Sequence, residues 1–442
     1  MPSASIHVLL LIAFASITAS AQGTLAARIA QAPDGFVRME YEARPGACGD
    51  GRDVVGFRHA IFANNFESYG GWSNVRCVPG PVRVSLTIAD RRPVSVRTQI
   101  GGSWSLATGR VTDLGTVSSR EAAAWFLAHV ADLEGSGRKG RILLPAVLAA
   151  DAPIVPSLLA LARDGARSDE TRRQAVQWVG QLGDASVVPA LVSFARGGAG
   201  GSAAVPNDEQ GDGAIDKRGK KGLGNAALAA LATLDDGAGV PALIELARAG
   251  DVAVRHSAVF WLGQSGDARA IRMLHTVIED ARENERVRAN AIFSLAHGDA
   301  TAPAEYAYLR GIFPRLESTR LKESVLQGMA EDDAGAGRWL LERARDARES
   351  MQVRRSALFW AGQREATPTS ELVAAYRDLD EAGLREHAIF VLSQRDDDAA
   401  VDALLHIARD DSDRRMRGKA LFWLAQKKDD RVTKLISDLL VK

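Results

Sequence analysis

The chain has 442 residues, and its 55 Lys and Arg are balanced by 55 Asp and Glu, so the formal net charge is zero. This balance gives no reason to expect nucleic acid or an anionic membrane surface as a partner, because both are bound by basic surfaces. Two Cys exclude a disulfide-dense miniprotein and a four-Cys zinc site. A hydrophobic fraction of 46% with only 6% aromatic residues indicates a core of Ala, Leu and Val, which suits packed helices.

Residues 1–21 have the pattern of a signal peptide. The apolar run 8–18 is too short for the roughly 20 residues that a membrane-spanning helix needs. It ends at Ala19-Ser20-Ala21, a small-x-small cleavage pattern. We expect residues 1–21 to be removed and the mature chain to be periplasmic or secreted, with no membrane span. The alternative is an N-terminal core helix.

Residues 22–117 predict a small β-rich domain. Apolar and polar residues alternate over 37–42, 82–88 and 94–100, and the segments between them are rich in Gly and Pro. Alternation with period two is typical of half-buried strands, and the last two segments predict a hairpin.

Both Cys residues fall in this predicted domain, as Cys48 and Cys77. In an exported chain with only two Cys, we expect them to form a disulfide. Closing a loop of this length stabilises a small domain by roughly 3–4 kcal/mol. The alternative is a reactive thiol, but the companion residues of a thiol enzyme are missing.

From residue 118 to residue 442 a helical motif repeats. Typical copies read VRHSAVFWLGQSGD and MRGKALFWLAQKKDD, and each copy has a reference position: Ala175, Ala227, Ala258, Ala291, Val325, Ala357, Ala388 and Ala420. From Ala227 onward these positions are 31 to 34 residues apart. A fixed period near 32 predicts a solenoid in which each unit packs on its neighbours. The predicted fold class is therefore mostly α, a solenoid of about eight helix pairs after the β-rich domain.

One interval breaks this period. Ala175 and Ala227 are 52 residues apart, and the surplus is the Gly-rich segment 196–222, which has no apolar periodicity. We expect a flexible insertion there. Upstream, two helical stretches at 121–133 and 142–162 predict a unit that caps the first repeat.

Two polar positions recur with the motif. An Asp stands eight or nine residues after the reference position, where it would cap the next first helix: Asp184, Asp236, Asp267, Asp299, Asp333, Asp397 and Asp429. A basic residue stands three positions before the reference position of each of seven repeats: Arg172, Arg255, Arg288, Lys322, Arg354, Arg385 and Arg417. We expect these basic side chains to lie beside a turn Asp as a structural ladder rather than to form an anion site.

Residues 118–442 resemble HEAT repeats in the short form named after phycobilisome lyases, in a chain of exported bacterial type. The short helical period, the recurring Arg and the turn Asp carry this resemblance. It implies an α-solenoid and a protein-interaction scaffold. The family also has a minority enzyme branch, the bilin lyases, so a lyase or cofactor-handling enzyme is the alternative. A purely structural envelope component is a third possibility. The β-rich domain matches no family motif.

Common catalytic signatures are missing from the sequence. It contains no G-x-S-x-G, H-E-x-x-H, Walker or dinucleotide-binding motif. The eight His residues are scattered, with none at helical ligand spacing from a second His or Cys. We therefore expect no catalytic residues, no metal site and no cofactor.

A helical wheel of the second helix of each repeat singles out one position. At about 100° per residue, the residue two positions after the reference points away from the buried arc, yet it is Phe in five of eight repeats. These residues are Phe260, Phe293, Phe359, Phe390 and Phe422, and the amides four residues later are Gln264, Gln363, Gln394 and Gln426.

Second helices of such solenoids line the concave surface, so an exposed Phe row would be a partner surface. The alternative is that tight curvature buries each Phe as core. The leading hypothesis is an exported, non-catalytic scaffold that holds a protein or peptide on this face.

Overall fold

The chain forms two compact units in the computed structural model, Met1–Val179 and Gly180–Lys442. The signal-peptide prediction for 1–21 and most of the predicted insertion 196–222 lie outside the described residues. The structure describes residues 23–52, 54–57, 60–62, 77–104, 108–134, 141–197, 222–298, 303–330, 335–427, 429 and 431–432.

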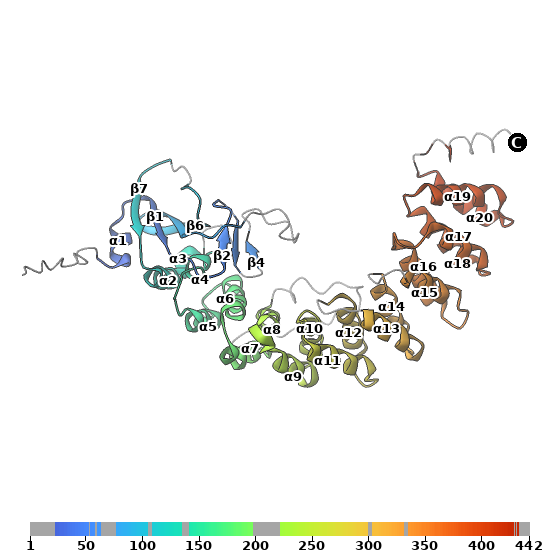
Figure 1. Ribbon diagram of the computed structural model, residues 1–442, viewed down its shortest axis with the longest axis horizontal. Coiled ribbons are helices and arrows are strands. Elements are labelled where there is room, and N and C mark those ends of the chain that lie inside the picture. Colours follow the sequence, from blue (N-terminus) through green and yellow to red (C-terminus); the bar gives the residue numbers. More distant parts are fainter. Residues whose placement is uncertain are drawn as a thin grey trace, which may run out of the picture. The chain divides into compact units, whose positions relative to one another are not determined.

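The first unit contains a four-stranded sheet in the order β6-β5-β1-β7 and a three-stranded sheet in the order β2-β3-β4 (Figure 1). In the larger sheet β1 pairs antiparallel with β5 and parallel with β7. Alternate side chains of β1 and β5 are buried, as their period-two sequence predicts. The strands are β1 (Gly35–Tyr41), β2 (Ala47–Gly49), β3 (Val55–Phe57), β4 (Ala60–Phe62), β5 (Val82–Ala89), β6 (Arg92–Ile100) and β7 (Val111–Thr116).

The predicted hairpin is confirmed as β5 and β6, which are joined by Asp90 and Arg91. Both turn residues have positive φ, at 51° and 61°, as the right-handed twist of a two-residue hairpin turn requires. The Asp34 carboxylate accepts hydrogen bonds from both of their backbone N–H groups at 3.1 Å. These bonds stabilise a conformation that Asp and Arg otherwise seldom adopt.

The predicted disulfide is also confirmed. Cys48 in β2 is bonded to Cys77, and their Cα atoms are 5.2 Å apart. The next residue of each segment takes part in an antiparallel bridge between Gly49 and Val78. The crosslink and the bridge together fix residues 77–78 to the small sheet.

Helices complete the first unit. The Tyr41 hydroxyl donates a hydrogen bond to the Pro145 carbonyl at 2.7 Å, and the Arg44 guanidinium donates to the Val147 and Ala152 carbonyls at 3.0 Å. The change from strand to helix follows Thr116, but the compact unit continues to Val179, beyond the predicted boundary at 117/118. The helices are α1 (Leu25–Gln31), which the sequence analysis did not predict, α2 (Ser119–Ala128), α3 (Val130–Leu133), α4 (Leu144–Val147), α5 (Val155–Arg163) and α6 (Asp169–Leu182).

The second unit is a stack of helix pairs, and every described element from residue 223 onward is helical. From α8 to α20 each even-numbered helix is the second of its pair, and successive second helices pack on one another (Figure 1). This arrangement confirms the predicted α-solenoid. The pairs are α7 (Val188–Ala195) with α8 (Leu223–Thr233), α9 (Val240–Ala249) with α10 (Val252–Gly263), α11 (Ala268–Glu279) with α12 (Glu285–His297), α13 (Pro303–Ile312) with α14 (Thr319–Gly328), α15 (Ala336–Arg345) with α16 (Met351–Gln363), α17 (Thr369–Asp378) with α18 (Ala382–Ser393), and α19 (Asp398–Asp410) with α20 (Arg414–Leu424).

Small residues allow neighbouring second helices to approach closely. Gly263 and Gly362 occupy the same register position, five residues after the reference. A Cβ added to Gly263 would lie 2.7 Å from the Ser294 Cβ, and one added to Gly362 would lie 2.0 Å from the Val391 Cγ1. Neither distance is compatible with a larger side chain, so these glycines set the spacing of the stack.

Ionic rungs connect successive repeats. The recurring basic residue of one second helix pairs with an acidic residue in the turn of the next repeat, in Arg255–Glu283, Lys322–Glu349, Arg354–Glu381 and Arg385–Asp411. Several of these side chains also bond the end of the preceding first helix, as Arg354 does with the Ala344 carbonyl. The expected ladder therefore exists, but its acidic members are mostly Glu of the inner turn rather than the recurring Asp.

Three of the recurring Asp residues that the structure describes cap helices as predicted, and one does not. Asp184, Asp267 and Asp397 each accept a hydrogen bond from a backbone N–H at the start of the next helix, which confirms their predicted role. Asp236 is a correction, because it lies inside a short 3-10 helix with φ of 56° and does not begin α9. Asp299 and Asp333 lie outside the described residues.

Candidate functional site

Five phenylalanines stand at one register position of the second helices, and we call them the aromatic row: Phe260, Phe293, Phe359, Phe390 and Phe422. Phe422 is 59% exposed, and the other four are partly exposed. Their helix neighbours Ala258, Leu262, Ala357, Leu392 and Leu424 are all at most 1% exposed. The row thus keeps the accessible surface that a partner-facing role requires, and partner binding there stays a prediction. In α14 the same position is Gln327, so the row has one polar interruption.

Neighbouring aromatic groups hold the rings of the row in place. Phe260, Phe359 and Phe422 each stand edge-on to the Trp that follows them, with centroids 5.1–5.2 Å apart. Phe390 contacts Trp423 of the next second helix at 5.4 Å. Rings fixed in this way lose little conformational freedom when a ligand covers them.

An amide row runs beside the aromatic row, four residues later on four of the five helices; in α12 this position is His297. Gln264 is partly exposed, and Gln363, Gln394 and Gln426 are exposed. Each amide offers two donors and an acceptor. Such groups suit the free N–H and C=O groups of an extended polypeptide.

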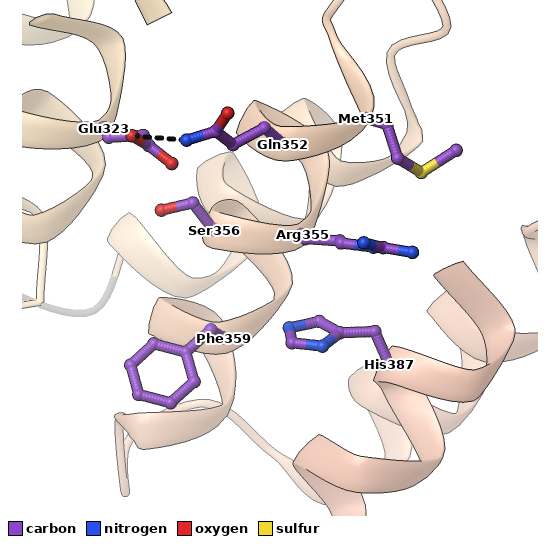
Figure 2. Close-up of a pocket in the computed structure, with 7 residues that line it drawn as sticks. All are labelled: Glu323, Met351, Gln352, Arg355, Ser356, Phe359 and His387. Atoms are coloured by element: carbon purple, nitrogen blue, oxygen red, sulfur yellow. Dashed lines mark hydrogen bonds between the residues drawn. The ribbon is translucent and has the colours of Figure 1, made fainter. Parts of the chain in front are cut away.

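A groove of about 500 Å³ opens on this surface between α14, α16 and α18 (Figure 2). Phe359 and His387 both line this groove, and the Glu323 carboxylate accepts a hydrogen bond from the Gln352 amide at 3.2 Å (Figure 2). The groove is lined by Glu323, Met351, Gln352, Arg355, Ser356, Phe359 and His387.

Two basic residues line this groove, Arg355 and His387. Arg355 is exposed, and it has no carboxylate partner among the residues that the structure describes. The Nε2 atom of His387 is buried and has no hydrogen-bond partner. Burial, and to a smaller extent the charge of Arg355, lowers the pKa of His387, so the ring is neutral at pH 7. The groove can therefore accept an anionic group at Arg355, with His387 close by.

Sequence reasoning identified the aromatic and amide rows but missed the groove. Arg355 lies two positions before its reference residue, whereas His387 lies one position before the next. Only the packing of α16 against α18 brings the two together. Conversely, the basic residues that recur three positions before each reference residue do not line the groove, because they form the ionic rungs.

Two further observations concern other kinds of site. In the described part of the chain, no group of three or more His, Cys, Asp or Glu side chains is arranged to hold a metal ion. None of the described helices has both the length and the apolar character to cross a bilayer.

Comparison with known families agrees with the repeat pattern. Residues 225–330 match the family model for HEAT repeats, and residues 171–196 match the model for the PBS lyase HEAT-like repeat. The predicted resemblance to HEAT-type repeats is thereby confirmed over these residues. A search of curated proteins finds no match to the chain.

Three solved structures match parts of the chain with low sequence identity and low TM-scores. The Escherichia coli protein YibA is 18% identical, with 49% of this chain and 79% of that chain covered and a TM-score of 0.31. The complex of CpcE and CpcF of phycocyanin lyase from Nostoc is also 18% identical, with coverages of 57% and 92% and a TM-score of 0.28. The Pds5–Scc1 complex is 10% identical, with coverages of 69% and 53% and a TM-score of 0.32. At such identities and scores these likenesses say nothing about activity.

Proposed function

We propose that this HEAT-repeat chain is a non-catalytic scaffold that binds a protein or peptide segment along the exposed face of its second helices. The observation that carries the proposal is the aromatic row, in which five Phe at one register position retain exposed surface while their helix neighbours are buried. Single exposed apolar residues are common, but apolar residues that recur at one exposed position of successive helices indicate an interaction surface. Repeat solenoids commonly use such extended surfaces for binding.

The size of the exposed surface fits this role. Phe buries on the order of 200 Å² when fully covered. At 59% exposure, the Phe422 side chain therefore leaves roughly 120 Å² open to a partner. Covering that area contributes about 3 kcal/mol before the entropic cost of association is subtracted. The partly exposed rings add smaller contributions along the same line, so a ligand that follows the row gains from several repeats at once.

We also propose that the mature chain works outside the cytoplasm, in the periplasm or as a secreted protein. The signal-peptide pattern of residues 1–21 and the Cys48–Cys77 disulfide support this location, because disulfides persist in oxidising compartments. Fractionation of a bacterium that expresses the full chain tests it. We expect a shortened, oxidised protein in the periplasm or medium. A full-length cytoplasmic protein with reduced Cys would contradict the proposal.

A displayed library of random peptides tests the binding function. Residues 22–442 serve as the bait, and the selected peptides are then titrated against variants. We expect Phe359→Ser combined with Phe390→Ser to weaken binding at least about tenfold, which corresponds to about 1.4 kcal/mol. The matched control is Val94→Ser, which removes a 42% exposed apolar side chain from the first unit and should leave binding unchanged.

Circular dichroism and the melting temperature show whether each variant is folded. Peptides that bind the folded Phe variant as tightly as the parent chain would contradict the proposed function. Failure to select any peptide that depends on the aromatic row would contradict it as well.

A further inference from the structure

The spacing of the aromatic row restricts the conformation of a bound segment. The second helices meet through Gly263 and Gly362, which lie against Ser294 and Val391 of the next helix. Helices in contact through such small residues have axes about 8–9 Å apart, at the lower end of the usual range. Equivalent Phe residues on successive helices therefore recur at about this interval.

Three peptide conformations can be compared with that interval. A β-strand presents side chains on one face about every 6.7 Å. An α-helix repeats a face about every 5.4 Å, or about 10.5 Å over seven residues. A polyproline II helix has three residues per turn and rises about 3.1 Å per residue, so it repeats a face about every 9.3 Å. Polyproline II agrees best with the spacing of the row.

The amide row also favours polyproline II over an α-helix. Polyproline II has no internal hydrogen bonds, so all of its backbone N–H and C=O groups are available. The exposed amides of Gln363, Gln394 and Gln426 run parallel to the aromatic row and can bond such groups. An α-helical ligand would present few free backbone groups to them, because its backbone is bonded internally.

The charge on the other side of the aromatic row is positive. At the exposed positions one, two and five residues before the reference, helices α10 to α20 carry only two carboxylates, Glu323 and Glu386, but five cations: Arg286, Arg320, Arg355, Arg415 and Lys419. This local excess contrasts with the zero net charge of the chain.

The ion pairs on this face show which of the five cations can still bind an anionic ligand. Arg415 and Lys419 both pair with Glu386, at 2.6 and 3.4 Å. Arg320 and Arg355 are exposed and have no carboxylate partner among the described residues. Two guanidinium groups on neighbouring second helices are thus free to bind anionic groups, and Arg355 lines the groove of Figure 2.

The pKa of a partly exposed histidine reflects the same positive charges. Burial, followed by the charges of Arg286 and Arg320, lowers the pKa of His256, which lies on the same exposed face. A positive potential disfavours the protonated ring, and it favours a carboxylate. The face therefore complements an acidic ligand.

On the basis of the scaffold function proposed above, we infer that the bound segment is an acidic peptide in the polyproline II conformation. Its apolar side chains recur at every third residue and lie on the aromatic row, its carboxylates face Arg320 and Arg355, and its backbone bonds the amide row. Three consecutive second helices carry Phe359, Phe390 and Phe422, so the minimal segment has apolar residues at positions i, i+3 and i+6. Where the segment extends to α14, Gln327 calls for a polar residue.

The sequences of peptides selected from the displayed library test this inference. We expect them to be acidic, to tolerate Pro and to carry apolar residues at i, i+3 and i+6. Inserting one residue between two apolar positions of a selected synthetic peptide should weaken binding about tenfold or more, and so should changing its carboxylates to Lys. Arg320→Glu combined with Arg355→Glu should reverse the charge preference. The matched control is Arg338→Glu, which changes a side chain that is 77% exposed on the first helix α15 and should have no effect.

The outcomes separate this inference from the function on which it rests. Selected peptides can be basic or neutral and still require the aromatic row for binding. That result would overturn the inference and leave the scaffold function standing. So would peptides with apolar residues at i, i+4 and i+7, the pattern of an amphipathic helix. If no selected peptide depends on the aromatic row, the scaffold function itself fails.

Discussion

Replacing Arg354 with Met removes one ionic rung of the solenoid while keeping much of the side-chain volume. The Arg354 side chain is among the most buried charged groups, with 5% of the residue exposed. Its Nε donates to the Ala344 carbonyl at 2.9 Å, and its Nη2 donates to Glu381 of the next repeat at 3.1 Å. The substitution therefore removes a bond within one repeat and a bond between two repeats.

The two losses differ in size. The Ala344 carbonyl loses a charge-assisted hydrogen bond in a buried setting, which costs about 1.5–3 kcal/mol. The Glu381 side chain is 39% exposed and can be solvated, so the loss of the ion pair adds little. We expect Arg354→Met to lower the free energy of unfolding by about 1.5–3 kcal/mol, chiefly through the unsatisfied carbonyl. The matched control is Arg348→Met, because its side chain is 86% exposed beside Asp346 and its removal should leave the free energy of unfolding nearly unchanged.

Urea unfolding and native-state hydrogen exchange measure this effect together. Repeat arrays can depart from two-state unfolding, so exchange of the α15 to α18 amides shows where stability is lost. We expect faster exchange in those four helices in the Arg354 variant. Equal stabilities of the Arg354 and Arg348 variants, within about 0.5 kcal/mol, would refute the view that rungs hold the repeats together.

Three further predictions test the packing, the crosslink and the buried histidine. Gly362→Ala should destabilise the chain by about 1–3 kcal/mol in urea unfolding, because its new Cβ meets a side chain of the next helix at 2.0 Å, whereas Gly418→Ala has open space and should be neutral or stabilising. Replacing Cys48 and Cys77 with Ser should destabilise the first unit by roughly 3–4 kcal/mol, and a melting temperature unchanged by this pair would count against the crosslink. Burial lowers the pKa of His387, so the neutral ring contributes its full stability above the unfolded pKa of about 6.5, and this stability is lost as pH falls below that value. When the pH is lowered from about 8 to about 5.5, the melting temperature of the parent chain should therefore fall further than that of the His387→Gln variant. Equal decreases would contradict the lowered pKa of His387.

The features that could be predicted from the sequence are those fixed by local pattern or covalent chemistry. The period near 32 and the helical wheel locate the second helices and the register of the aromatic row without any tertiary information. The alternation over 82–100 defines the β5–β6 hairpin, and two Cys in one domain leave a single possible pairing. Capping by Asp267 and Asp397 likewise depends only on residues close in the chain.

The features that could not be predicted depend on contacts between distant segments. Glu283 and Glu381 complete rungs with basic residues 28 and 27 positions earlier, a pairing that only the stacking of repeats creates. Asp236 adopts a left-handed conformation that its place in the motif does not reveal. The groove joins Arg355 to His387 from different register positions, so alignment of the repeats separates the two residues.

Site-specific photo-crosslinking tests most directly whether the aromatic row is the binding surface. A benzophenone side chain at position 390 replaces one Phe of the row with another aromatic group of similar character. The control carries the same group at position 338, where the parent side chain is exposed on a first helix. With a biotinylated peptide selected from the displayed library, we expect crosslinking from position 390 and none from position 338. Crosslinking from position 338 alone would place the partner on the opposite helices and contradict the account.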